Sequence, residues 1–202
     1  MARPRTRDYE ALRRDLLDAA GRILAEEGPQ ALSTRRIAGE VGTSTTAVYN
    51  LFGGKSGLLR AMFLEGFARL AEQFATVPCD GDPEADLMEL GHAYRASALA
   101  NPHLYELMFG HPVPDFRPDE AALAQIQGTF DTLVRAVARC VDSGRFAPVD
   151  PLGIAVHLNA LVHGLASLEL YGRLGDRDQA DRHWRLALEA SLRGHRDAGA
   201  AD

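Results

Sequence analysis

The sequence has few cysteines, and neither is placed for a metal or redox site. Cys79 and Cys140 are the only two in 202 residues, and they lie far apart in the chain. Zinc and dithiol sites use closely spaced cysteine pairs such as CxxC, which this sequence lacks. We therefore expect both thiols to be reduced and structural, as in a cytoplasmic protein.

The sequence also lacks an uninterrupted apolar run of membrane-spanning length. Its most apolar long stretch, residues 151–171, is broken by His157, Asn159, His163 and Glu169. A transmembrane helix needs about 20 predominantly apolar residues, so this stretch is predicted to be a buried helix of a soluble protein. The basic N-terminus is followed by no apolar segment, which argues against a signal peptide.

The patterns of common catalytic and metal sites are incomplete. GGKS at residues 53–56 matches the end of a phosphate-binding loop, but the required first glycine falls at Tyr49. A single Glu-x-x-His, Glu89 to His92, lacks the second copy that a di-iron bundle needs. The seven histidines form no HExxH motif. We therefore expect no enzymatic activity, no metal and no cofactor.

Strand-like alternation and internal repeats are missing as well, whereas apolar residues recur at helical spacing along most of the chain. An all-α fold of about nine helices is therefore predicted. Glycine, proline and capping residues place these helices at about residues 8–27, 34–41, 45–52, 56–74, 83–99, 102–109, 119–142, 151–171 and 176–193.

Charge is unevenly distributed along the chain. Residues 1–60 contain 10 Lys+Arg against 7 Asp+Glu, a balance of +3, whereas residues 61–202 contain 12 against 21, a balance of −9. A basic N-terminal segment followed by an acidic remainder is typical of a protein with a small N-terminal DNA-binding domain. Three arginines in residues 2–7 are expected to form a flexible tail that adds non-specific attraction to phosphate.

Residues 33–60 have the form of two short helices joined by a tight turn. Ser33 and Ser44 are suitable N-caps, because their hydroxyls can accept hydrogen bonds from free backbone N–H groups. Gly42 stands where the first helix must end and the chain must turn sharply. A helix, a short glycine-containing turn and a second helix make a helix-turn-helix, whose second helix enters the DNA major groove.

The polar side chains of this region suit contacts with DNA. Hydroxyls and amides bind phosphate oxygens and base edges, and Lys55, the only lysine of the chain, follows the second helix closely. A small polar surface helix with ordinary caps is the alternative that the local pattern leaves open. We expect phosphate contacts from Thr34, Arg35, Ser44, Tyr49 and Lys55, and base contacts from Thr45, Thr46 and Asn50.

Residues 8–63 resemble the DNA-binding domain of the TetR family of transcriptional regulators. The matching features are the helix LLDAAGRILAEEG with its final glycine, then Thr34, Ile37-Ala38, Tyr49-x-x-Phe52 and Lys55. The chain has Thr45-Thr46 where the family often has Lys-Gly, and Gly53-Gly54 where it often has Pro-Ser. The resemblance implies an all-helical homodimer that represses genes and leaves its operator when a small molecule binds the C-terminal domain.

On this basis residues 1–60 are expected to form the helix-turn-helix domain, and helix 56–74 to join it to an effector-binding and dimerisation domain, residues 61–202. Helix 151–171 is apolar nearly all round, which exceeds what one core-facing stripe requires. We therefore expect a second copy of the chain to pack against this helix in a dimer. The predicted dimer interface consists of Leu161, Gly164, Leu165 and Leu168.

The helices of the second domain carry more aromatic and methionine surface than a narrow helix seam requires. A mostly apolar cavity with a few polar groups is the usual form of a ligand site. A plain, filled core is the alternative interpretation of the same residues. The expected pocket residues are Tyr94, His103, Leu104, Met108, Phe109, Phe130 and His163.

The segments NPHLYELMFGHPVPDF and ALVHGLASLEL resemble the C-terminal domain of TetR-like regulators named for a Trp-His-Gly signature. His163-Gly164 supply the His and Gly, and Asn159 stands at the position of the Trp. Two functions stay open at this point. One is a ligand-responsive repressor, and the other is a helical enzyme or small-molecule binding protein with a vestigial helix-turn-helix.

Overall fold

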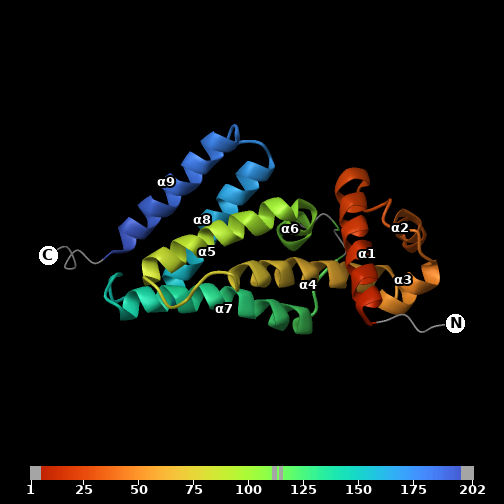
Figure 1. The fold of residues 1–202 in the computed structure, drawn as a ribbon, viewed down its shortest axis with the longest axis horizontal. Coiled ribbons are helices and arrows are strands. Elements are labelled where there is room, and N and C mark those ends of the chain that lie inside the picture. The colour runs from red at the N-terminus through yellow and green to blue at the C-terminus, as the bar shows by residue number, and fades with distance from the viewer. Residues whose placement is uncertain (1–5, 111–112, 114–115, 197–202) are drawn as a thin grey trace. The chain divides into compact units, whose positions relative to one another are not determined.

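The computed structural model describes residues 6–110, 113 and 116–196, and these residues form nine α-helices (Figure 1). The predicted all-α fold is confirmed, and each helix begins and ends within two residues of its predicted position. The helices are α1 (Thr6–Glu27), α2 (Thr34–Val41), α3 (Thr45–Phe52), α4 (Lys55–Phe74), α5 (Pro83–Ala100), α6 (Pro102–Phe109), α7 (Glu120–Asp142), α8 (Pro151–Leu170) and α9 (Arg177–His195).

The first helix begins earlier than the sequence suggested. Thr6 and Arg7 belong to α1, although they were expected to be part of a flexible tail. The rest of that predicted tail, residues 2–5, lies outside the described residues.

Capping side chains explain where several helices start. The hydroxyls of Ser33 and Ser44 each accept a hydrogen bond from the backbone N–H three residues on, at 3.2 and 3.1 Å. At the start of α9, Asp176 and Gln179 form a reciprocal capping box. Each such cap stabilises its helix by about 1 kcal/mol, so α2 and α3 begin where their serines stand.

Glycines end the two short helices. Gly42 and Gly53 have φ values of 72° and 70°, in the left-handed region that side chains with a Cβ rarely adopt. The N–H of Gly53 donates to the carbonyl oxygen of Tyr49 at 2.8 Å, which satisfies a terminal acceptor of α3. The helices therefore stop after eight residues each.

The chain divides into two compact units, Met1–Ala68 with Asn101–Gln125, and Arg69–Ala100 with Ile126–Asp202. α4 and α7 each run from one unit into the other. Compactness does not test which part binds DNA, an effector or a second copy, so the functional domains 1–60 and 61–202 stay predictions.

In the first unit, α1 packs against α2 and α6, and α2 packs against α3. A Cβ added at Gly21 would lie 2.0 Å from Cδ2 of His103, and one at Gly66 would lie 2.4 Å from Sδ of Met108. Both distances are far below van der Waals contact. Glycine at these two positions therefore lets α6 lie close to α1 and α4. The central side chains of this unit are Leu16, Leu17, Ile37, Val48, Leu58 and Met62.

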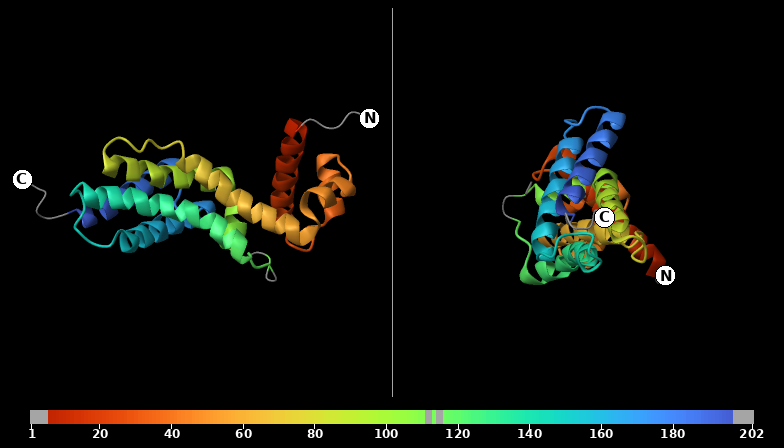
Figure 2. Two further views of the ribbon diagram at one scale, coloured as in Figure 1. Left: turned by 90° about the horizontal axis from the view of Figure 1, so that it is seen from below. Right: turned by 90° about the vertical axis from the view of Figure 1, so that its left-hand side faces the viewer.

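In the second unit, α8 packs against both α5 and α9, and α5 also touches α9 (Figure 2). Glu169 of α8 accepts hydrogen bonds from Nε and Nη2 of Arg95 at 2.8 and 2.6 Å, and from Nε1 of the fully buried Trp184 at 2.6 Å. A carboxylate taken out of water needs such charge-assisted bonds to offset its desolvation. This network therefore joins α5, α8 and α9.

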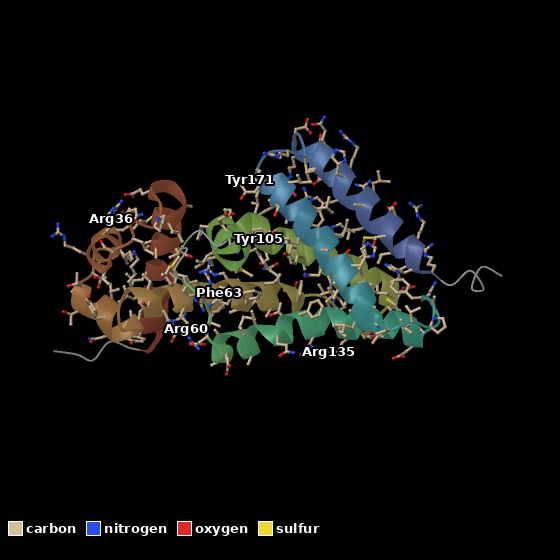
Figure 3. The ribbon with its side chains drawn as sticks, turned by 180° about the vertical axis from the view of Figure 1, so that it is seen from behind. Arg36, Arg60, Phe63, Tyr105, Arg135 and Tyr171 are labelled. Carbon is tan, nitrogen blue, oxygen red and sulfur yellow. The ribbon has the colours of Figure 1, made fainter. Side chains whose placement is uncertain are left out.

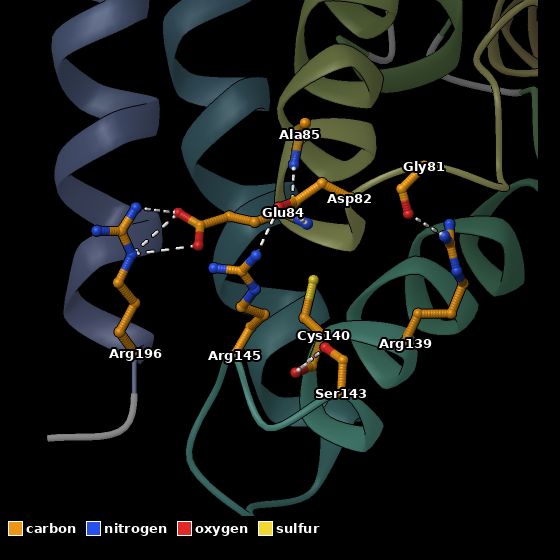
Figure 4. Close-up of polar contacts among 9 residues, drawn as sticks. All are labelled: Gly81, Asp82, Glu84, Ala85, Arg139, Cys140, Ser143, Arg145 and Arg196. Carbon is orange, nitrogen blue, oxygen red and sulfur yellow. Dashed lines mark hydrogen bonds and ion pairs between the residues drawn. The ribbon is translucent and has the colours of Figure 1, made fainter. Parts of the chain in front are cut away.

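Ion pairs also fix the first turn of α5 (Figure 4). Asp82 accepts a hydrogen bond from the N–H of Glu84 at 2.9 Å and pairs with Arg145 at 2.7 Å. Glu84 in turn accepts from Nε of Arg196 at 3.1 Å. The backbone hydrogen bond from Glu84, ahead of the nearby arginines, lowers the pKa of Asp82. The first turn of α5 is thus linked to Arg145, which follows α7, and to Arg196, which follows α9.

The prediction that residues 151–171 form a buried helix is wrong in part. Only 28% of the most apolar stretch of α8 is buried, and Leu152, Val156 and Leu168 are 48%, 54% and 42% exposed. The physical reason is that α5 and α9 cover one side of α8 and leave another apolar side open. By length and composition α8 is also the one described helix that could cross a membrane, which alone is weak evidence for a span.

Candidate nucleic-acid interface

The face of α3 opposite the core is polar and open. Val48 is fully buried and Phe52 nearly so, which turns the other side of the helix outward. Thr45, Thr46 and Asn50, the predicted base-reading residues, are all exposed. Two hydroxyls and an amide offer both donors and acceptors to base edges. The geometry of α3 is therefore suited to direct readout in a major groove.

The predicted phosphate-binding residues surround this face. Arg35, Ser44 and Lys55 are exposed, Tyr49 is 56% exposed, and Thr34 is half-buried. Ser44 accepts a backbone N–H as the cap of α3, which leaves its own hydroxyl proton for a phosphate oxygen.

Lys55 is held at the first turn of α4 by a neutral partner. Its Nζ donates to the carbonyl oxygen of Pro29 at 2.9 Å, in the loop between α1 and α2. A neutral acceptor leaves the positive charge uncompensated, and an ammonium group has three protons to donate. Lys55 can therefore keep this bond and still pair with a phosphate.

Arg36, which neighbours Arg35 on α2, has a different environment (Figure 3). Its Nη1 pairs with Glu40 at 2.6 Å, and its Nη2 pairs with Glu27 at 2.9 Å. The hydrogen bond to Glu40, followed by that to Glu27, raises the pKa of Arg36. Because two carboxylates offset its charge, Arg36 is less suited to a phosphate contact than Lys55, whose described partner is neutral.

Two domains of one protein family match the chain, and together they span most of it. "Bacterial regulatory proteins, tetR family" matches residues 16–62, which contain the α2–α3 pair, and "Tetracyclin repressor-like, C-terminal domain" matches residues 87–191. The second match alone covers more than half of the 202 residues. The chain belongs to the TetR family. The predicted family resemblance is thereby confirmed, whereas the Trp-His-Gly subtype stays a prediction.

Two individual proteins to which this chain is similar each share less than 30% sequence identity with it. The HTH-type transcriptional regulator Rv1816 of Mycobacterium tuberculosis is 26% identical over 137 residues, which are 64% of this chain and 58% of that regulator. The chain thus matches little more than half the length of this relative. A solved protein of unknown function from Rhodococcus sp. RHA1 is 29% identical, with a TM-score of 0.75 over 92% of this chain and 96% of that one.

A second solved structure extends the likeness of fold. The TetR family regulator PfmR from Thermus thermophilus has a TM-score of 0.73 at 20% identity, over 88% of this chain and 97% of that one. At this identity the likeness concerns the fold alone.

The residues predicted to line the effector pocket of this TetR-family chain are divided between the two units. In the second unit, the hydroxyl of Tyr94 lies 3.4 Å from Nδ1 of His163, and burial lowers the pKa of that histidine. Phe130 belongs to the same unit and is half-buried. The pocket as a whole stays a prediction. The predicted pocket residues of the first unit are His103, Leu104, Met108 and Phe109, all on α6.

The predicted dimer residues lie along α8 of the second unit. Gly164 is exposed, and a Cβ added there would meet nothing within 4 Å. Leu168 is exposed, while Leu161 and Leu165 are half-buried. Their role in dimerisation stays a prediction.

Sequence reasoning missed the role of Arg36. Its four-residue spacing from Glu40 is a signal for a helical ion pair and could have identified that half of the arrangement. The pairing with Glu27 depends on how α1 and α2 meet, for which the sequence holds no local pattern. The same is true of the salt bridge between Arg13 and Glu65 at 3.0 Å, which joins α1 to α4.

Proposed function

We propose that the protein is a DNA-binding transcriptional regulator, most simply a repressor. We further propose that it is soluble and acts in the cytoplasm. The observation that carries this proposal is the exposed polar face of α3, formed by Thr45, Thr46 and Asn50 opposite the buried Val48 and Phe52. Such a face on a short helix after a tight turn is what a major groove accepts. Membership of the TetR family supports the same conclusion.

The proposal includes a homodimer with two-fold symmetry. The open side of α8 carries Leu152, Val156 and Leu168, with Gly164 between them along the helix. A contiguous apolar side of this kind is favourable to bury, and glycine permits close approach of a second backbone. The helix-turn-helix domains of the two copies would then bind half-sites about 34–36 Å apart, so the operator should be a near-palindrome.

The proposal further includes a small, mainly apolar effector that binds the C-terminal domain and weakens DNA binding. Its support within the second unit is the half-buried Phe130 and the contact between the hydroxyl of Tyr94 and Nδ1 of His163, which would serve as a polar anchor. To move the bound population from 1:99 to 99:1, the effector must prefer the non-binding form by about 5.5 kcal/mol.

Fluorescence anisotropy with labelled DNA tests the DNA-binding part directly. The probe is the duplex upstream of the protein's own gene, and the control is a shuffled duplex of equal length and composition. We expect binding to the first duplex to be on the order of 10³-fold tighter at equal salt. Equal affinity for both duplexes, or no binding to either, would favour the alternative of a vestigial helix-turn-helix.

A further inference from the structure

Two histidines of the second unit face each other from α8 and α9. Nδ1 of His157, on the second turn of α8, lies 3.0 Å from Nε2 of His195, the last residue of α9. The centroids of the two imidazole rings are 5.1 Å apart. His157 is exposed and His195 is half-buried, so the pair lies at the surface of this unit.

The position of His195 is fixed by contacts that do not involve His157. Its carbonyl oxygen accepts a hydrogen bond from the N–H of Ala147 at 3.0 Å, and Phe146 and Arg196 form an isolated β-bridge beside it. The ring of Phe146, which is 1% exposed, packs on the imidazole of His195 with 5.8 Å between centroids. A side chain held in this way loses little further freedom when it binds a ligand.

The arginine next to the pair has its charge offset by a carboxylate. Arg196 follows His195 directly, and its Nε donates to Oε1 and Oε2 of Glu84 at 3.1 and 3.2 Å (Figure 4). This pairing weakens the repulsion that the guanidinium would exert on a nearby cation. Neutral imidazole nitrogens are common ligands of divalent transition metals. The surroundings of the two rings are therefore compatible with a bound metal ion.

The separation of the two nitrogens indicates the kind of ion. Imidazole nitrogens bind such ions at about 2.1 Å. Two of them are about 3.0 Å apart when they subtend a right angle at the ion, and about 3.4 Å apart in a tetrahedral arrangement. The observed 3.0 Å therefore favours an ion that takes neighbouring ligands at right angles, as Ni²⁺ and Cu²⁺ do.

We propose that His157 and His195 bind one such divalent ion, Ni²⁺ or Cu²⁺, through Nδ1 and Nε2 respectively, and that the ion cross-links α8 to the end of α9. The proton between the rings moves to the other nitrogen of its own ring, so each ring stays neutral and no net proton is released. Among the described residues no third His, Cys, Asp or Glu completes a larger metal-binding group, so water fills the remaining positions.

This site is independent of the proposed function, because it involves neither DNA nor a second copy of the chain. The sequence could not indicate it, because the two histidines are 38 residues apart and belong to different helices. The proposal therefore revises the expectation from sequence that the chain holds no metal.

Isothermal titration calorimetry of the untagged full-length protein with NiCl₂ at pH 7.5, where imidazole is mainly neutral, tests the site. We expect one Ni²⁺ per chain. His157→Gln should bind Ni²⁺ at least about tenfold more weakly, because even the loss of an outer partner of a metal site costs about 10–100-fold in affinity. His183→Gln, at an exposed histidine of α9, and Cys79→Ser, which removes the exposed thiol, should bind like wild type.

A second measurement separates metal binding from a purely structural role of the pair. Saturating Ni²⁺ should raise the melting temperature of wild type and of His183→Gln, but not that of His157→Gln or His195→Gln. Circular dichroism verifies that each variant is folded, and the exposed position of His157 makes its variant the safer one.

Three results would each overturn the proposal. They are no Ni²⁺ binding at millimolar concentration, wild-type affinity in His157→Gln, and an equal loss of affinity in His183→Gln. Zn²⁺ binding more than about tenfold tighter than Ni²⁺ would contradict the right-angle geometry and with it the assignment of the ion.

Discussion

Nδ1 of His157 lies 3.0 Å from Nε2 of His195, so two imidazole rings join α8 to the last residue of α9. A hydrogen bond between two ring nitrogens requires one proton between them, which one ring donates and the other accepts. If both rings become fully protonated, two N–H groups and two positive charges face each other. Burial, and next the charge of His157, lower the pKa of His195.

This arrangement predicts that acid destabilises the second unit. The folded-state pKa of His195 lies below its ordinary value of 6.5, so the folded protein binds fewer protons than the unfolded chain. Stability is then fully present above pH 6.5 and is lost as pH falls through the lowered pKa. His163, whose pKa is lowered by burial, acts in the same direction.

Thermal melts at several pH values between 7.5 and about 5 measure this effect. His195→Gln should flatten the decline in melting temperature, because the variant has no imidazole to protonate at that position. His183→Gln, which changes an exposed histidine of the same helix, is the control and should keep the wild-type profile. A wild-type melting temperature that is constant over this range would contradict the prediction.

Asn50→Ala should alter base preference. The exposed amide of Asn50 can form two hydrogen bonds with an adenine edge, and its loss should cost about 1–3 kcal/mol at one or two base positions only. Anisotropy titrations against a set of operator variants measure this cost. An equal loss of affinity on all sequences would mean that Asn50 does not read bases.

Lys55→Ala should weaken binding by about the same factor on every DNA sequence and lower the salt slope by about 1. The change also removes the bond to the carbonyl oxygen of Pro29, so the melting temperature must be compared with wild type. Lys55→Arg keeps the charge and should retain most of the salt dependence. If Lys55→Ala leaves the slope unchanged, this side chain makes no phosphate contact.

Gly164→Leu should separate the dimer without unfolding the chain. A Cβ added at Gly164 meets nothing within 4 Å in a single chain, so we expect a larger side chain there to obstruct a second copy and not the fold of the chain itself. Gly128→Leu on α7 is a matched control, since it also has open space around it. Light scattering after size exclusion should show monomers for the first variant and dimers for the second. A wild-type monomer at micromolar concentration would refute the dimer.

The helices could be predicted from sequence because their signals are local. Ser33, Ser44 and Asp176 are caps, and Gly42 and Gly53 are ends, whose effects depend on a few neighbouring residues. In the structure Val48 and Phe52, four residues apart on α3, are buried, and the predicted base-reading residues Thr45, Thr46 and Asn50 are exposed.

What could not be predicted depends on contacts between distant segments. The placement of α6 against α1 requires Gly21 and His103 to meet, and no local pattern links positions so far apart. The incomplete burial of α8 is a similar case. Its composition indicated a helix surrounded by protein, but which neighbours cover it is decided by the fold of the whole unit.

The absence of a side chain at Gly66 should also restrict which residue pairs relatives of this protein carry at positions 66 and 108. A methyl group there would lie 2.4 Å from Sδ of Met108, so the methionine side chain must shift or be replaced when position 66 gains a Cβ. Relatives that carry alanine at the first position should carry a shorter side chain than methionine at the second. Position 66 is thus expected to vary in step with a residue on another helix rather than with its own neighbours in the chain.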